Sequence, residues 1–347
     1  MLNIKFLSIG LLMFISLILF TAACDNNGQA ATSSEEDEPI VIRMANQVEE
    51  GNFLNQGYVK FKEYIERESD GRVKVEIYNG GLISSSDEQV VELLNSGAIQ
   101  LSTSSAYGVS NITNVQGFNI FDMPFMFTDR EEAYSILDGE YGEQLRREVS
   151  ETQNVEVMGY IDLGFYSIMN GERAVRTPED LNGLTVRSSA ATLHLEALKD
   201  LGANPTPMSY SEVFTGLQQG TIDGVSTTTP LIYGDRFFEV NKNLTLADYV
   251  FLPHILMVNE DFYNDLPDDV KELFHEAVDV YIEEARELAI EAEQDAIEGL
   301  REEGVEVIEL TDEEMEAFRR ETEETREENI DEVGQDNYDK VMELLER

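Results

Sequence analysis

Two kinds of apolar pattern alternate along the first third of the chain. The strand-like runs cover residues 41–46, 72–78 and 99–105, and the helix-like runs cover 52–68 and 87–95. Each helix-like run lies between two strand-like runs. This β-α-β-α-β order predicts a parallel sheet with helices packed on it.

The rest of the chain continues the alternation and then becomes helical. Residues 155–161 are a further strand candidate, residues 177–249 repeat the strand–helix order on a smaller scale, and 251–259 is an apolar run that we expect to be buried. Residues 268–303 have helical spacing that is too irregular for a coiled coil. A capping-box pattern at Thr311 predicts the start of the last helices.

The most specific signals lie between Thr177 and Pro230. This stretch begins Thr-Pro-Glu-Asp-Leu-Asn-Gly-Leu-Thr-Val-Arg-Ser-Ser-Ala. Thr177 can cap a helical turn, and Asn182-Gly183 can end that turn. Arg187 then closes a short β-type run. A helix-like segment, a loop over 202–213, a second helix and the run Gly-Thr-Ile-Asp-Gly-Val-Ser-Thr-Thr-Thr-Pro follow.

This order and spacing resemble the DctP-type solute-binding protein of a tripartite ATP-independent periplasmic (TRAP) transporter. The resemblance runs from about Val41 to the C-terminus. It includes Gly-Arg-Val-Lys-Val-Glu-Ile-Tyr at 71–78, Asp-Met-Pro-Phe-Met-Phe at 122–127 and Leu-Pro-Asp-Asp-Val-Lys at 266–271. It implies an α/β fold of the periplasmic-binding-protein type, with two lobes, a ligand cleft between them and a long helix that braces both.

The same resemblance implies discontinuous lobes, because the chain crosses between them more than once. We expect residues 39–163 with about 250–290 in lobe I, and 164–249 with about 291–347 in lobe II. Ligands of open α/β sheets bind beyond the carboxyl ends of the strands, which in this fold is the inter-lobe cleft.

Arg187 is the strongest candidate for ligand binding. In the family, the arginine after this turn holds the ligand's carboxylate, and its planar fork matches two carboxylate oxygens as a lysine cannot. Other candidates are polar side chains at strand ends or at positions matching the family. The expected ligand-binding set is Arg187, Asn46, Tyr166, Tyr210, Ser105, Tyr107, Thr228 and Thr229, with Ser104 and Thr227 as neighbours of the same kind.

Tyr166 is a departure from the family pattern. Many relatives carry a second arginine at this place, whereas Tyr166 supplies a hydroxyl and an aromatic face but no charge. A ligand with two ionised ends therefore fits less well than a monocarboxylate with hydroxyl or keto groups. Tyr249 stands where relatives often carry histidine, and a buried core aromatic is an equal interpretation of it.

The first 24 residues read as a lipoprotein signal peptide. An apolar run follows Lys5, and Thr21-Ala-Ala-Cys24 resembles a lipobox, although leucine is usual at the first of these positions. A spanning helix is the alternative. Cys24 is the only cysteine, so we expect it to be lipidated and to tether the chain to the outer face of the cytoplasmic membrane. Residues 25–38 read as a flexible tether.

The charge of the chain is extreme. The formal net charge is −46, and 34 acidic against 8 basic residues follow from Glu260 onward. Nucleic acid is therefore not an expected partner, because a phosphate backbone needs a basic face. This charge would repel an anionic ligand at low salt, whereas at ~1 M salt the screening length falls to ~3 Å. We infer a salt-rich habitat.

No pattern for catalysis, a metal or a cofactor is present in the sequence. The three histidines have no histidine or cysteine at metal spacing, and the sequence has no nucleophile elbow, phosphate-binding glycine loop, dinucleotide fingerprint or calcium loop. We therefore expect a receptor without cofactor or enzymatic activity.

The leading interpretation is a tethered receptor. It would bind a small organic acid (a sugar acid, a hydroxy or keto acid, or a C4-dicarboxylate) and deliver it to the small and large permease subunits in the membrane. A receptor for a zwitterionic compatible solute is the main alternative, although the sequence has no tryptophan and no clear acid beside Asn46. A sensor subunit and a secreted lipoprotein enzyme are further alternatives.

Overall fold

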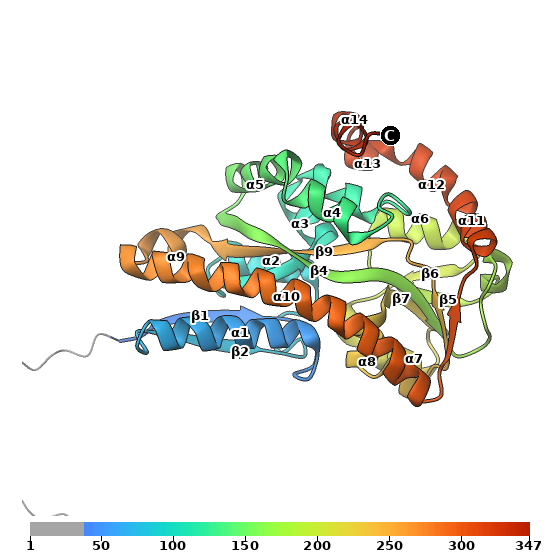
Figure 1. Ribbon diagram of the computed structural model, residues 1–347, viewed down its shortest axis with the longest axis horizontal. Coiled ribbons are helices and arrows are strands. Elements are labelled where there is room, and N and C mark those ends of the chain that lie inside the picture. Colours follow the sequence, from blue (N-terminus) through green and yellow to red (C-terminus); the bar gives the residue numbers. More distant parts are fainter. Residues whose placement is uncertain (1–37) are drawn as a thin grey trace, which may run out of the picture. The chain divides into compact units, whose positions relative to one another are not determined.

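The computed structural model describes residues 38–347 (Figure 1). The signal peptide, most of the tether and Cys24 lie outside these residues. Within the described part of the chain, no helix combines the length and the apolar character that crossing a membrane requires.

The described residues form an α/β structure, as predicted. The strands are β1 Ile40–Ala45, β2 Val73–Tyr78, β3 Leu101–Ser105, β4 Val155–Asn170, β5 Thr185–Ser188, β6 Asn204–Pro207, β7 Gly224–Thr228, β8 Asn243–Leu246, β9 Phe251–Asn259 and β10 Glu306–Glu309. The α-helices are α1 Phe53–Glu68, α2 Asp87–Asn95, α3 Ala106–Thr113, α4 Arg130–Leu137, α5 Glu140–Thr152, α6 Thr192–Asp200, α7 Val213–Gln219, α8 Thr229–Gly234, α9 Glu260–Asp265, α10 Asp268–Glu302, α11 Asp312–Glu321, α12 Glu323–Glu328, α13 Ile330–Val333 and α14 Gln335–Leu344. Four short 3₁₀ helices are η1 Gln116–Asp122, η2 Pro178–Leu181, η3 Tyr210–Glu212 and η4 Phe237–Glu239.

The long strand β4 connects two groups of elements. Its first half pairs with β9, and its second half pairs with β7 and β8, all antiparallel. We call β1–β3, β9, α1–α5 and η1 the first lobe, and β5–β8, β10 and α6–α8 with η2–η4 the second lobe. The pairing of β4 with β9 is irregular between Asp162 and Phe165, where Gly164 has a φ of +98°. A β-bulge of this kind bends a strand, so β4 changes direction where it passes from one lobe to the other.

The sheet of the first lobe differs from the predicted one. Strands β1 and β2 are parallel, as expected, but β3 pairs antiparallel with β9 and not with β1. Side chains take over part of the missing ladder. The Gln100 side chain accepts from the Arg43 amide (3.0 Å), and the Ser102 hydroxyl donates to the Ala45 carbonyl (2.6 Å). The Gln100 amide also donates to the Arg43 carbonyl (2.9 Å), so β1 lies beside β3 without a regular ladder, whereas the strand that forms a ladder with β3 comes more than 140 residues later in the chain.

The segment expected as a loop over 202–213 contains a strand. Strand β6 pairs parallel with β5 at the end of the sheet order β10-β8-β4-β7-β5-β6. Two of its four residues, Pro205 and Pro207, cannot donate to a ladder, which confines such a strand to a sheet edge. The sequence Asn-Pro-Thr-Pro has no alternation of apolar and polar residues, so the pattern did not predict a strand here.

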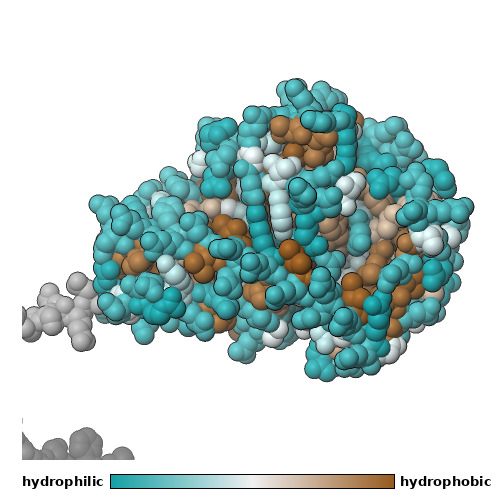
Figure 2. Space-filling model, in the orientation of Figure 1, coloured by the Kyte–Doolittle hydropathy of each residue, from teal (hydrophilic) through white to brown (hydrophobic). Residues whose placement is uncertain are grey.

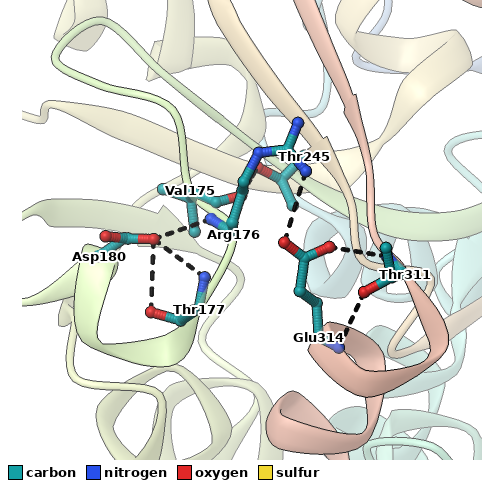
Figure 3. Close-up of polar contacts among 7 residues, drawn as sticks. All are labelled: Val175, Arg176, Thr177, Asp180, Thr245, Thr311 and Glu314. Atoms are coloured by element: carbon teal, nitrogen blue, oxygen red, sulfur yellow. Dashed lines mark hydrogen bonds and ion pairs between the residues drawn. The ribbon is translucent and has the colours of Figure 1, made fainter.

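The turn before β5 has the predicted capping (Figure 3). The Asp180 carboxylate accepts from the amides of Arg176 (2.9 Å) and Thr177 (3.0 Å), and Gly183 ends the turn with a φ of +83°. The Arg176 guanidinium reaches Glu314, which closes the predicted capping box with Thr311 at the start of α11. These contacts fix the position of the start of β5, and therefore the position of Arg187 within this strand.

Helix α10 is the long brace that the sequence predicts. It runs for 35 residues and packs on α1 of the first lobe and on α8 of the second. One side of it is apolar and buried, whereas the face turned to solvent is mainly hydrophilic (Figure 2). The C-terminal helices α13 and α14, which the resemblance places in lobe II, bury Val333 and Val341 in the apolar core of the first lobe.

A buried ionic cluster joins β4 to α10 where the lobes meet. Asp162 of β4 is fully buried and pairs with Arg130, which also bonds Glu293 of α10 at 2.5 Å. The Tyr134 hydroxyl donates to the same Asp162 carboxylate (3.0 Å). The cluster therefore ties the bend of β4 to the bracing helix.

Asp162→Ala should lower the free energy of unfolding by about 3 kcal/mol, because it leaves the Arg130 guanidinium half-buried without its innermost acid. Urea unfolding followed by circular dichroism measures this loss. Glu309→Ala is the control, since Glu309 pairs with Arg301 on the surface with side chains 70% and 47% exposed, and exposed pairs contribute less than about 1 kcal/mol. Equal losses in the two variants would contradict the assignment.

Candidate ligand-binding site

A cavity of about 60 Å³ lies between the two lobes, at the ends of β1, β3, β5 and β7. One water needs about 10–15 Å³ on this measure, so the cavity has room for roughly five water-sized groups. Six of the expected ligand-binding residues line it: Asn46, Ser105, Tyr107, Tyr166, Arg187 and Tyr210. The cleft predicted at the carboxyl ends of the strands is therefore present, and a hollow of about 300 Å³ shares Tyr107, Arg187 and Tyr210 with it.

Arg187 is buried in this cavity without an acidic partner. Its side chain is 5% exposed, and Nε and Nη2 both donate to the Met208 carbonyl, at 3.0 and 2.8 Å. No Asp or Glu of residues 38–347 forms an ion pair with it. Burial lowers the pKa of Arg187 from its ordinary value, because the charged form has lost its water. The guanidinium is held in place without a direct ion pair, and Asp87 of the cavity wall acts on its charge from a distance.

The first lobe presents an amide and a hydroxyl to the cavity. Asn46 follows the end of β1; its side chain donates to Asn79 (2.8 Å) and accepts from the Val48 amide (3.2 Å). Ser105 ends β3, and its oxygen caps α3 by accepting from the Gly108 amide (3.2 Å), which leaves its proton free for a ligand. Neighbouring Ser104 instead donates to the Asp87 carbonyl, away from the cavity.

Three tyrosines form much of the remaining wall. Tyr166 is 4% exposed and packs against the His194 ring, with ring centres 5.0 Å apart. The ring of Tyr210 lies against the Arg187 guanidinium at 5.5 Å. Burial raises the pKa of Tyr166 and of Tyr107, so both hydroxyls stay protonated. The Tyr166 hydroxyl can donate to a ligand, whereas Glu88 competes for that of Tyr107. Tyr249 is a buried core residue whose hydroxyl bonds Ser226 (2.6 Å).

Of the three consecutive threonines, the structure places only one in the cavity wall. Thr227 lines the cavity, whereas Thr228 and Thr229 do not. Side chains alternate along a strand, so Thr228 of β7 points to the opposite face, where its hydroxyl has no partner among the described residues. Thr229 begins α8 and bonds Ser167 (2.9 Å).

Four charged or titratable residues in the wall were missed by the sequence analysis. These are Asp87, Asp122, His194 and His254. Asp87 lies at the start of α2 and accepts from Gln47 (3.4 Å), directly after Asn46 in the chain. An acid therefore does lie near Asn46, contrary to the argument made against a zwitterionic ligand. Because the chain has 70 acidic residues, no sequence signal distinguishes Asp87 and Asp122 from the others.

A family model described as "Bacterial extracellular solute-binding protein, family 7" matches residues 44–332. The chain belongs to this family. The resemblance to the DctP-type solute-binding proteins of TRAP transporters is thereby confirmed, as is the two-lobed α/β fold.

Three relatives show how far the similarity of this solute-binding protein extends. The C4-dicarboxylate-binding periplasmic protein DctP of Rhodobacter capsulatus is 30% identical over 81% of this chain and 84% of its own. The 2,3-diketo-L-gulonate-binding periplasmic protein YiaO of Escherichia coli is 28% identical over 84% and 87%. The crystal structure of the sugar acid binding protein DctPAm from Advenella mimigardefordensis, in complex with galactonate, is similar at a TM-score of 0.84 and 26% identity, over 88% of this chain and 98% of that one.

A chain of polar groups crosses the inner end of the solute-binding protein's cleft. Asp122 of the first lobe lies 3.0 Å from His194 Nε2, and the other ring nitrogen of His194 bonds the Ser189 hydroxyl (2.8 Å). These are the residue types of a hydrolytic triad, but there serine bonds Nε2 and aspartate bonds Nδ1, the reverse of the order here. The second oxygen of Asp122 is buried and has no partner among the described residues. It is available to accept from a ligand.

Thr227→Val should weaken ligand binding by about fivefold, because it removes one hydroxyl from the cavity wall and keeps the shape of the side chain. Thr228→Val is the matched control, since its hydroxyl faces away from the cavity and bonds nothing among the described residues. Isothermal titration calorimetry with the best-binding acid measures both. A larger loss for Thr228→Val would show that the register assigned to β7 is wrong.

Proposed function

We propose that this solute-binding protein captures a small monocarboxylate that carries hydroxyl or keto groups. The observation that carries the proposal is the buried guanidinium of Arg187, which bonds a carbonyl oxygen and no acid among the described residues. A buried charge without a counter-ion is costly, by several kcal/mol, and a ligand carboxylate would remove that cost. Galactonate and diketogulonate, named for two of the relatives, are acids of this kind, whereas the C4-dicarboxylates named for the third carry a second carboxylate.

The rest of the wall supports a single carboxylate. Tyr166 stands where a second arginine would hold a second ionised end, and Asp87 and Asp122 would repel one. The same two acids, with Ser105 and Thr227, are suited to accept from or donate to ligand hydroxyls. A hydroxylated monocarboxylate therefore matches the charges of the cavity better than a C4-dicarboxylate does.

A zwitterionic solute is the second candidate. Its carboxylate would bind Arg187, and its cationic end would lie near Asp87 or Asp122 among the tyrosines of the wall. The two acids make this candidate stronger than the sequence suggested.

The ligand class and the role of Arg187 can be tested together. Dye-based thermal unfolding in molar salt, against galactonate, succinate and glycine betaine, suits a chain without tryptophan. A ligand at 100 times its dissociation constant stabilises by about 2.7 kcal/mol, a shift of a few degrees. We expect the shift with galactonate.

Arg187→Ala should weaken that binding at least about 30-fold, because the loss of a buried charged pair costs 2–5 kcal/mol. Arg187→Lys should recover only part of it, since an ammonium cannot form the bidentate pair. A shift with glycine betaine alone would favour the second candidate, and full affinity in Arg187→Ala would remove the basis of both.

The expected location of the protein in the cell depends on residues outside those described. We propose that Cys24, after cleavage of the signal peptide, carries a lipid that holds the receptor at the outer face of the cytoplasmic membrane, where it delivers its ligand to the permease subunits. The mass of the Cys24 peptide from cells tests this: an unmodified cysteine there would exclude the tether. No enzymatic step is part of the proposal.

The surface charge generates a separate prediction. With a formal net charge of −46, the protein should bind an anion faster as salt rises from about 0.1 M to 1 M, because the screening length falls from ~10 to ~3 Å. Stopped-flow association rates measure this, with a zwitterion as the control that should respond little. An association rate for the anion that falls as salt is added would contradict both the repulsion and the salt-rich habitat inferred from it.

A further inference from the structure

Asp235 joins the two lobes at the rim of the cleft. It follows α8 of the second lobe, and its Oδ1 accepts from two donors of the first lobe, the Glu49 amide at 3.2 Å and the Asn52 side chain at 3.3 Å. Its Oδ2 accepts from the Tyr210 hydroxyl at 2.5 Å. Burial raises the pKa of Asp235 to about 6, although these three bonds act in the opposite direction. The carboxylate therefore lies in a partly buried contact between the lobes.

Tyr210 connects this contact to the ligand cavity. One side of it reaches Asp235 through the hydroxyl, and its ring packs against the Arg187 guanidinium at 5.5 Å. Tyr210 is also two residues after Met208, and the Met208 carbonyl accepts both hydrogen bonds from Arg187. A change at Asp235 therefore reaches the arginine through a single intervening side chain.

A glycine allows the lobes to approach at this point. A Cβ added at Gly234 would lie 2.6 Å from Nδ2 and 3.1 Å from Cγ of Asn52, across the lobe boundary. The three nearest atoms it would meet all belong to Asn52. A methyl group at Gly234 would thus obstruct the closed arrangement and would have room once the lobes separate.

We propose that Asp235 is the latch that couples closure of the lobes to capture of the ligand, and that it acts as a positioning residue for Arg187 through Tyr210. The proposal rests on the proposed role of Arg187 in holding the ligand's carboxylate. When the lobes are apart, Asp235 loses both first-lobe donors and is hydrated. When they close, the Glu49 amide and Asn52 fix its carboxylate, which fixes the Tyr210 hydroxyl and places the ring against the guanidinium. The same bonds then stabilise both the closed arrangement of the lobes and the orientation of the Arg187 guanidinium.

Gly234→Ala tests the latch without touching a ligand-binding side chain. The association rate of galactonate should stay unchanged, and its dissociation rate should rise roughly tenfold, since the variant hinders only the closed form. The liganded variant should also keep a larger radius of gyration in small-angle X-ray scattering than the liganded parent. Gly51→Ala is the matched control, because Gly51 lies on the same rim and a Cβ there would meet nothing within 4 Å.

Tyr210→Phe and Asp235→Ala separate the latch from the proposed function. Tyr210→Phe keeps the ring against Arg187 but loses the bond to Asp235, and both variants should raise the dissociation rate roughly tenfold while still binding galactonate. Loss of binding in Arg187→Ala alone, with parental dissociation rates in all three latch variants, would overturn the latch and leave the proposed function intact. Parental affinity in Arg187→Ala would instead remove the function on which the latch rests.

Discussion

Taking a guanidinium out of water costs several kcal/mol unless an anion compensates its charge. Arg187 is 5% exposed, and its protein bonds go to a carbonyl oxygen. A carbonyl can orient the fork but cannot neutralise it. The guanidinium therefore lacks a carboxylate in direct contact, although Asp87 acts on it from a distance. The short strand β5, the capped turn before it and the ring of Tyr210 keep it in one place. The missing contact makes the site a receptor for an anion.

Two long elements connect the lobes. Strand β4 contributes to the sheet of both lobes, and α10 packs on α1 and α8. The bend of β4 is tied to α10 by the buried pair of Asp162 and Arg130. Beside these continuous elements, the lobes contact each other at the rim through Asp235 and at the other end of the cleft through Asp122 and His194. A ligand stabilises the closed form by its differential affinity for that form.

Acidic residues act differently on the surface and in the cleft. On the surface, the excess of 70 acidic over 24 basic residues creates a long-range field that salt screens. In the cleft, Asp87 and Asp122 lie among low-dielectric side chains, where screening is weak and the sign of each charge discriminates between ligand ends. Salt can therefore raise the association rate of an anion without changing the selectivity of the cleft among anions.

Local signals in the sequence were enough to predict much of the fold and the central residue of the site. The capped turn at Thr177, the long helix from Asp268 and the capping box at Thr311 depend on neighbouring residues, and the structure has all three. Arg187 followed from the turn that precedes it and from the family order of motifs. Asn46 and Ser105 followed from their places at strand ends.

Only the tertiary structure decided the strand pairing and the rest of the wall. Strand β3 forms its ladder with β9, a segment more than 140 residues away in the chain, which no local pattern reveals. Three consecutive threonines carry no periodic signal, so the pairing of β7 with β4 decides that Thr227 faces the cavity. Asp87, Asp122 and Asp235 are indistinguishable in sequence from the many solvated acids. Their roles arise from the distant partners that burial brings within a few ångströms of them.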